Sequence, residues 1–175
     1  MPILIITLLL IVFFTVFFIT KLIDTITSSK APAIATPTTA LEQIRLALEI
    51  STRDEVWEVG CGDGKVISYC ANKHPGCQFI GIENGIQMYL KALWRTYNQP
   101  NVRIIFGNFK KTPPNSATKI YLYLLPETLR EYKKLIPKKA TVISLEFKIP
   151  SLRPYKTISL KQPTKLAHKL FLYKF

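Results

Sequence analysis

Apolar residues along this chain fall into one long uninterrupted run, followed by short runs that alternate with amphipathic segments. The first run, residues 2–20, contains no charged residue and is dominated by Ile, Leu, Val and Phe. At about 1.5 Å of rise per residue, a helix of this length spans roughly 28 Å, close to the ~30 Å hydrocarbon layer of a bilayer. The pattern therefore predicts a membrane-spanning helix near the N-terminus.

A secretory signal peptide is the competing interpretation, because the sequence from Ala33 to Ala35 offers a small-x-small pattern typical of a cleavage site. No Lys or Arg precedes the run, the run is longer than the usual signal segment, and the small residues lie well beyond its end. These features favour an uncleaved anchor over residues 1–26. Lys21 and Lys30 follow the span, so the positive-inside rule places the rest of the chain in the cytoplasm.

The remaining chain is long enough for one domain. Residues 27–39, rich in Ser, Thr, Ala and Pro, predict a linker, and residues 40–175 predict the domain itself. Its first helix is expected over residues 40–49, with Thr38 or Thr39 as the N-cap. Apolar runs then alternate with amphipathic segments, which is typical of a mainly parallel sheet covered on both faces. The expected strands lie near residues 56–59, 77–83, 102–106, 118–124 and 140–147, and the expected helices near residues 65–73, 86–97 and 127–135.

The pattern changes after Phe147. The segment IPSLRPYK has two prolines and is too short for a crossover helix. Two further strands follow it, KTISL at residues 156–160 and AHKLFLYKF at residues 167–175. A hairpin that closes the edge of the sheet is the simplest arrangement, and its last strand would be antiparallel.

The most informative chemical signal is the segment VWEVGCGDGKVI, residues 56–67, in which an apolar strand runs into a glycine-rich turn and then a helix. Glycines let backbone amides approach a ligand closely, and here they fall as GxGxG at Gly60, Gly62 and Gly64. A dinucleotide site would favour GxGxxG, and the acids Glu58 and Asp63 would repel a pyrophosphate. These acids suit a ligand with a cationic amino group and a sulfonium, so the turn predicts S-adenosylmethionine rather than NAD.

A second acid strengthens this interpretation. The segment QFIGIEN, residues 78–84, is another apolar strand, and its Glu83 lies about twenty residues beyond the glycine turn. A carboxylate at that distance is placed to bind ribose hydroxyls. A plain strand-to-helix turn or a solvated strand end would explain either feature alone, but the two together, correctly spaced, favour a cofactor site.

Cysteine content and charge further limit the kinds of site and partner that this chain can have. The three cysteines form no CxxC pair and have no nearby His cluster, which predicts neither a disulfide framework nor a metal site. Cys61 lies in the glycine turn and is predicted to be one of the cofactor-binding residues, whereas Cys70 and Cys77 are expected in the core. The net charge is +13, and most of the basic residues of the C-terminal half are balanced only by Glu146. Such a surface suits anionic lipid headgroups or a nucleic-acid backbone.

Taken together, several of these segments resemble the class I, seven-strand S-adenosylmethionine-dependent methyltransferases. Within that class the chain is similar to the archaeal broad-specificity protein lysine methyltransferases and to the membrane-anchored mitochondrial lysine methyltransferases that act on ATP synthase subunit c and the adenine nucleotide translocase. The resemblance covers residues 31–175. It rests on the segments APAIATP, EVGCGDGK, GIE, GNF, YLYLLPE, SLEFKIP and LFLYKF. It implies a Rossmann-like seven-strand α/β sheet with an antiparallel last strand, preceded by one N-terminal transmembrane helix.

The resemblance also implies roles for individual residues. Thr36 and Pro37 would close over the cofactor from the N-terminal side. Tyr123 and Glu146 would face the methyl group and accept hydrogen bonds from the substrate amine, with Leu124 and Phe147 on the substrate side. Asn108 and Phe109 would flank the adenine. Four residues would surround the methionine part of the cofactor, with Glu83 on the ribose hydroxyls: Glu58, Gly60, Gly62 and Gly64.

The chain departs from the family in two segments. The family usually has an aromatic residue and a further proline where this chain has Ala33 and Ala35, and Gly and Trp where it has Ser151 and Leu152. Both segments border the substrate side.

Three functions are consistent with the sequence. The first is a membrane-anchored protein-lysine N-methyltransferase that acts on membrane or membrane-associated proteins, with its basic C-terminal half against anionic lipid headgroups. The second is methylation of a lipid, quinone or other small amphiphile. The third is a non-catalytic scaffold that binds S-adenosylmethionine. Methylation of nucleic-acid amines generally uses a D/NPPY-like motif after the fourth strand, where this chain has YLLPE, so nucleic acid is not the expected substrate.

Overall fold

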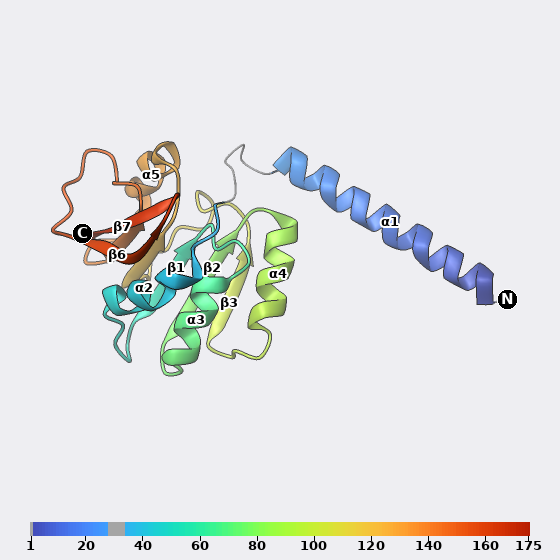
Figure 1. Ribbon diagram of the computed structural model, residues 1–175, viewed down its shortest axis with the longest axis horizontal. Helices are drawn as coiled ribbons and strands as arrows, with labels where there is room; N and C mark the ends of the chain where they lie inside the picture. The colour runs from blue at the N-terminus through green and yellow to red at the C-terminus, as the bar shows by residue number, and fades with distance from the viewer. Residues whose placement is uncertain (1, 28–33) are drawn as a thin grey trace.

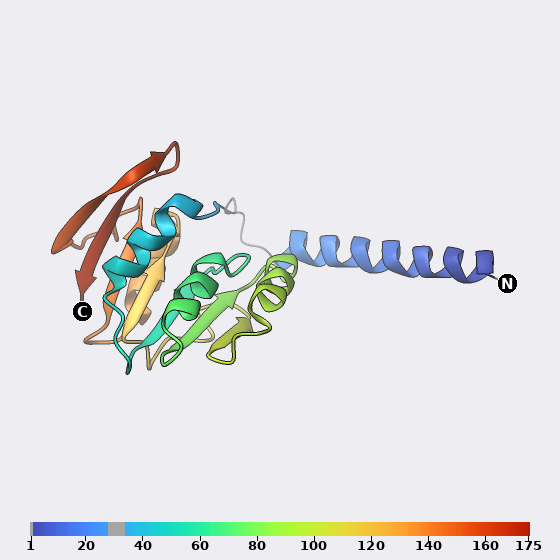
Figure 2. The same cartoon turned by 60° about the horizontal axis from the view of Figure 1, so that its bottom comes forward.

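A computed structural model describes residues 2–27 and 34–175 of the chain (Figure 1). The linker residues 28–33, and with them Ala33, lie outside the described part. An N-terminal helix, α1 (Pro2–Thr27), extends away from an α/β domain (Figures 1 and 2). Residues 2–22 are long and apolar enough to cross a membrane, a property that signal sequences share.

The domain is a seven-stranded sheet with helices on both faces. The strands are β1 (Glu55–Val59), β2 (Gln78–Glu83), β3 (Val102–Phe106), β4 (Lys119–Leu122), β5 (Thr141–Leu145), β6 (Lys156–Thr164) and β7 (Ala167–Lys174). The helices are η1 (Thr38–Ala40), α2 (Leu41–Leu48), α3 (Lys65–Lys73), α4 (Ile86–Thr96), α5 (Pro126–Tyr132) and η2 (Lys133–Leu135). The strand order is β3-β2-β1-β4-β5-β7-β6. Strands β1 to β5 are parallel, and β7 runs antiparallel to both β5 and β6, which confirms the predicted edge hairpin.

Alternation along the strands produces two apolar layers. In β4, Tyr121 faces the layer that contains α2 and α3, whereas Ile120 and Leu122 face the layer that contains α5. All three side chains are almost completely buried. Burying an apolar side chain of this size contributes about 1.5–3 kcal/mol, so both faces of the sheet stabilise the domain. Cys70 and Cys77 are buried in the first layer, as predicted.

The start of the domain differs from the prediction. Neither Thr38 nor Thr39 caps α2, because both lie in the short helix η1 and α2 follows with Ala40 at its N-cap position. Instead, the Thr39 hydroxyl donates to the Gln162 carbonyl of β6 at 3.5 Å. A tertiary contact with the edge hairpin has therefore replaced the local cap.

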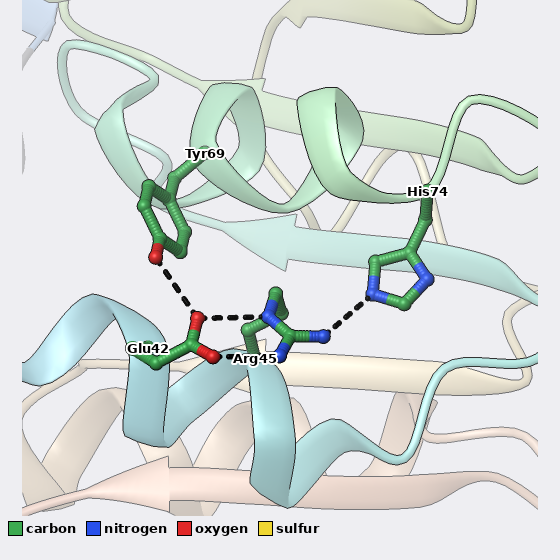
Figure 3. A network of polar contacts seen from close by, with 4 residues as sticks. All are labelled: Glu42, Arg45, Tyr69 and His74. Carbon is green, nitrogen blue, oxygen red and sulfur yellow. Dashed lines mark hydrogen bonds and ion pairs between the residues drawn. The ribbon is translucent and has the colours of Figure 1, made fainter.

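Helices α2 and α3 are joined by a polar network (Figure 3). The Glu42 carboxylate accepts hydrogen bonds from Arg45, at 2.7 and 2.8 Å, and from the Tyr69 hydroxyl at 2.9 Å. Arg45 also lies 3.2 Å from His74 at the end of α3. The bonds from Arg45 and then Tyr69 lower the pKa of Glu42 to about 2, so this network persists at neutral pH.

Candidate cofactor-binding site

The candidate site is a cleft at the carboxyl ends of β1, β2 and β4. Two adjoining cavities form it and share five lining residues, which come from the N-terminal segment, the glycine turn, α4 and the end of β4: Ile34, Gly60, Gly62, Met88 and Tyr123. Strand β1 lies between β2 and β4, so the chain builds the sheet outward from β1 first in one direction, through β2 and β3, and then in the other, through β4 and β5. A reversal of this kind is where open α/β sheets bind their ligands.

The glycine turn forms the floor of the cleft. The amides of Gly60 and Cys61 both donate to the Ile82 carbonyl, at 2.8 and 3.0 Å, which holds the turn against β2. Gly60 and Gly62 have φ values of +69° and +55°, a left-handed conformation that glycine adopts without strain. A Cβ on Gly62 would meet no atom within 4 Å, because this position opens into the cavities. The space that a side chain would occupy is therefore available to a ligand.

Gly64, predicted to surround the ligand, has another position. It lines neither cavity. A Cβ on Gly64 would lie 3.1 Å from the Cβ and 3.2 Å from the Cα of Ala92 in α4. Its role in this structure is to let α3 and α4 approach each other closely.

Glu83 lies at the end of β2 and is nearly buried. Its Oε1 accepts from the amides of Asn84 and Gly85, at 3.0 and 2.8 Å, and its Oε2 accepts from the Gly62 amide at 2.8 Å. A carboxylate offers about four acceptor positions, so Oε2 retains capacity for another donor. Because Glu83 also lines the larger cavity, a hydroxyl group there could fill that capacity. The predicted ribose-binding role fits this geometry.

Three acidic residues contribute carboxyl groups to the cleft. Glu58 is buried, and its Oε2 accepts from the Ile67 amide in the first turn of α3 at 3.1 Å. Burial raises the pKa of Glu58 well above its usual value, and the nearby charges of Asp63 and Glu83 raise it further. Asp63 is paired with Arg95 at 2.7 Å and lines the smaller cavity. A ligand cation placed here would be attracted to the Glu83 and Asp63 carboxylates and would lower the pKa of Glu58, which favours its ionised form. This fits the cationic cofactor predicted from sequence.

The N-terminal segment forms one wall. The Thr36 and Tyr121 hydroxyls lie 2.9 Å apart in a buried hydrogen bond, and Lys65 donates to the Thr36 carbonyl at 3.3 Å. Thr36 lines the smaller cavity together with Ile34. Pro37, predicted to close over the cofactor, lines neither cavity and instead precedes η1.

The opposite wall carries the residues assigned to the adenine. Asn108 and Phe109 both line the larger cavity. The Phe109 ring packs edge-to-face on Tyr132, with ring centroids 5.3 Å apart, and the Asn108 Oδ1 accepts from the Lys110 amide at 2.9 Å. These contacts hold both side chains in place without a ligand. Cys61, from the turn, lines the smaller cavity.

The predicted substrate side is aromatic and apolar. Tyr123, Leu124 and Phe147 line the larger cavity, and the Tyr123 and Phe147 rings are stacked with centroids 6.5 Å apart. The Tyr123 hydroxyl donates to the Leu166 carbonyl in the turn between β6 and β7. Burial raises the pKa of Tyr123, and the charge of Glu146 adds to this, so the phenol is neutral at physiological pH. With its proton committed to Leu166, the phenol oxygen can act as a hydrogen-bond acceptor.

Glu146 was predicted to face the methyl group together with Tyr123, but its side chain points away from the cleft. Its Oε2 accepts from the His168 amide at 2.6 Å, and its Oε1 lies 3.0 Å from His168 Nδ1. It lines neither cavity. Burial acts to raise the pKa of Glu146, but the hydrogen bonds from His168 outweigh it and lower the pKa. In this structure Glu146 holds the β6–β7 hairpin against the end of β5.

The cleft also contains residues that the sequence did not single out. Asn84 and Gly85 follow Glu83 directly, so their position after an apolar strand is a signal that could have found them. Met88 lies one turn into α4, and Thr128 lies near the start of α5; neither has a local sequence signal. Within residues 2–27 and 34–175, no three His, Cys, Asp or Glu side chains gather as metal ligands would.

Comparison with known proteins places these features in context. The family described as "Putative methyltransferase" matches residues 52–131, from the strand before the glycine turn to α5. A tRNA (guanine-N(7)-)-methyltransferase of Thermotoga maritima is 35% identical over 74 residues, which cover 38% of this chain and 24% of that protein. A protein-lysine N-methyltransferase of Saccharolobus islandicus is 26% identical over 97 residues, which cover 54% of this chain and 60% of that protein. The chain thus spans only part of the length of both relatives.

A solved structure matches more of the chain. The RNA methyltransferase from Salinibacter ruber in complex with S-adenosyl-L-homocysteine is 20% identical, with a TM-score of 0.72. The match covers 80% of this chain and 92% of that one. S-adenosylhomocysteine is the demethylated form of the cofactor that the glycine turn predicts. On the sheet order, the glycine turn and this structural match, the chain has the fold of the class I S-adenosylmethionine-dependent methyltransferases.

Proposed function

We propose that this chain is a membrane-anchored S-adenosylmethionine-dependent methyltransferase whose substrate is a lysine side chain of a protein at the membrane. The observation that carries the proposal is the acidic, glycine-floored cleft, which continues directly into an aromatic chamber around Tyr123. The resemblance to protein lysine methyltransferases and the partial match to one of them support the same class of substrate.

The residues of the acidic half are arranged to hold the cofactor. S-adenosylmethionine supplies a methyl group activated by a sulfonium. Glu83 would bind its hydroxyl groups, and Gly60 and Gly62 would give its amino acid part access to the backbone. Burial raises the pKa of Glu58, and a bound cation would lower that pKa and so stabilise the ionised carboxylate beside it. Asn108 and Phe109 would flank its base.

The aromatic half is arranged to receive an amine. A lysine has a reference pKa of about 10.4, so only a small fraction is neutral at pH 7, and it must lose a proton before its nitrogen can accept a methyl group. Leu124 and Phe147 line the chamber with apolar surface, and an amine that enters it would lose water, which disfavours the charged ammonium. The Tyr123 oxygen, oriented by its bond to Leu166, can accept a hydrogen bond from the amine and align it.

The connection to α1 restricts which substrates the cleft can meet. Seven residue steps separate Thr27, the last residue of α1, from Ile34, which lines both cavities. An extended chain covers at most about 3.6 Å per residue, so the cleft lies within roughly 25 Å of the end of α1. If α1 spans a bilayer, the cleft is held at the membrane surface, where a lysine of a membrane protein is within reach.

RNA methylation is a second candidate, favoured by two of the matched proteins and by the net charge of +13. A basic surface attracts a phosphate backbone without regard to sequence. The short reach from the membrane and the apolar chamber favour the protein substrate over this alternative.

The test uses the full chain in membranes of its own host, incubated with methyl-labelled S-adenosylmethionine. Protein, RNA and lipid fractions are separated, and the protein fraction is hydrolysed and analysed for methyllysine. Label in methyllysine supports the proposal, and its loss in Glu83→Ala ties it to the cleft. Label only in 7-methylguanosine or only in the lipid extract overturns the substrate assignment, and cofactor binding without any transferred label favours a scaffold.

A matched pair of variants tests the role of the chamber. Tyr123→Phe removes the acceptor oxygen, whereas Tyr155→Phe makes the same change at a half-exposed tyrosine before β6. We expect Tyr123→Phe to lower the methylation rate with unchanged cofactor affinity and Tyr155→Phe to have no effect. Equal rates in both variants would exclude Tyr123 from the reaction.

A further inference from the structure

Helix α4 has an apolar face that remains largely exposed among the described residues. Leu90, Trp94 and Tyr97 are 51%, 79% and 76% exposed, and Leu93 beside them is 37% exposed. Spacings of three and four residues place these side chains on one side of the helix. Ala92 and Thr96, which are buried, mark the other side, where α4 packs on the domain.

The apolar surface continues onto the edge of the sheet. Phe106, at the end of the edge strand β3, is 45% exposed, and its ring centroid lies 5.3 Å from that of Tyr89 in α4. In the described residues 34–175, nine large apolar side chains are exposed, and five of them belong to this surface. We call it the α4 face and define it as Leu90, Leu93, Trp94, Tyr97 and Phe106. Apolar surface gathered in this way marks an interaction site rather than ordinary surface variation.

We propose that the α4 face docks into the interfacial layer of the bilayer that α1 crosses, a proposal that rests on the membrane anchoring in the proposed function. The C-terminal end of α1 lies against α4, and Figures 1 and 2 show the two helices adjacent at the same corner of the domain. The α4 face therefore lies on a helix that contacts the one segment of the described chain that is long and apolar enough to span a membrane.

The composition of the face fits this occupant. Trp and Tyr are the residues enriched at membrane–water interfaces, because an apolar ring with a polar group suits the headgroup level. Lys91 lies on the flank of the face in α4 and is exposed. Basic side chains in such positions extend toward headgroups while their stems cover apolar surface.

Docking would also orient the cleft. Met88, on the same helix, lines both cavities, and Gly85 at the helix start lines the larger one. A domain held by the α4 face therefore presents the mouth of the cleft close to the interface. The substrate lysine would be one that lies at headgroup depth in a membrane protein.

This placement differs from contact through the basic C-terminal half. Strands β3 and β6 form opposite edges of the sheet, so the hairpin that carries many of those lysines lies far from α4 (Figure 1). Contact through that edge would be electrostatic and weakened by salt, whereas insertion of the α4 face buries apolar surface and depends little on salt.

The chain offers an internal probe. It contains two tryptophans, of which Trp57 is buried in the sheet and Trp94 belongs to the α4 face. The full chain is reconstituted into phosphatidylcholine vesicles with or without brominated acyl chains, and flotation with the vesicles reports anchoring independently of docking. Trp94→Phe gives the signal of Trp57 alone. Trp94→Phe combined with Tyr155→Trp moves the probe to the side of the domain that carries β6.

We expect brominated lipid to quench most of the Trp94 emission, at low and at high salt, and to leave both Trp94→Phe and the double variant unquenched. Flotation without quenching of Trp94 overturns the proposal, even if methylation is observed. A blue-shifted but unquenched Trp94 also overturns it, because a protein surface or a second copy would then cover the face. Quenching of the double variant alone would place the β6 side at the membrane instead. Because none of these readouts requires methyl transfer, failure of docking and failure of the proposed reaction are distinguishable.

Discussion

Substitution of Gly62 by alanine separates cofactor binding from folding. The left-handed φ of +55° makes an alanine strained, which costs about 1–2 kcal/mol. The added methyl group meets no protein atom within 4 Å, so packing adds nothing to that cost. In a chain of this size about 1 kcal/mol corresponds to roughly 2–4 °C in melting temperature. We therefore expect Gly62→Ala to fold with a melting temperature only a few degrees lower.

Cofactor binding should respond much more strongly. The methyl group would occupy the part of the cleft where the Gly62 amide lies against Glu83. Inserting a methyl group into a filled site costs about 1–3 kcal/mol, which corresponds to roughly 5- to 150-fold weaker binding. The measurements are thermal unfolding and S-adenosylmethionine binding by calorimetry, both on the full chain in detergent.

Two other glycines provide the comparison. Gly64→Ala has a similar φ, +73°, but its Cβ would lie 3.1 Å from Ala92, so we expect a larger loss of stability and intact binding by the folded fraction. Gly76→Ala should change neither quantity, because its Cβ would meet nothing and its φ is outside the left-handed range. Normal cofactor affinity in Gly62→Ala would refute the assignment of this cleft.

Three further substitutions or conditions test the fold and the site. In Gly81→Ala a Cβ would lie 2.8 Å from the Cys61 Sγ, so we expect a loss of about 1–3 kcal/mol in unfolding free energy that Cys61→Ala partly restores; unchanged melting would contradict this packing. Burial, and then the charge of Arg45, lower the pKa of His74 from 6.5, so stability present above that pH is lost as the pH falls through the lower folded value. Melting temperatures measured between pH 7.5 and 5 should fall less in His74→Gln than in the unmodified chain, and equal losses would exclude His74. Tyr123→Phe should lower the rate of methyl transfer about 10- to 100-fold, the value of a hydrogen bond to a charged group, and a normal single-turnover rate would contradict it.

Much of the fold could be predicted because the strands are defined by local patterns. The edge strand β3 has the predicted bounds, 102–106, and β2 and α4 agree within a residue at each end. Buried parallel strands need continuous apolar runs, and the helices between them need one apolar face, so both leave a clear sequence signal.

The acidic half of the site could also be predicted from the sequence. Its features depend on backbone conformation and on the distance between two strand ends, and both are local. Gly60, Gly62 and Glu83 lie where the spacing placed them, on one cleft. Strand pairing of β1 with β2 is what brings the turn and the carboxylate together.

The remaining positions depend on contacts between distant segments. Gly64 faces Ala92 of α4, and Glu146 turns toward His168 in the edge hairpin, although both stand beside residues that line the cleft. Thr39 bonds to β6 rather than capping α2. In each case a partner more than 20 residues away decides the orientation, and spacing along the chain contains no information on it.

Helix α4 has more apolar surface than its packing on the domain buries. Its apolar residues extend around more than one side, a pattern that is typical of a helix buried on both sides. The structure buries only the side with Ala92 and leaves Trp94 and Tyr97 exposed, at the corner of the domain where the C-terminal end of α1 lies. An apolar face of this size in water opposes solubility, and the bilayer that α1 is proposed to cross would bury it without a further protein. The proposed membrane anchoring would then also explain the second apolar side of α4.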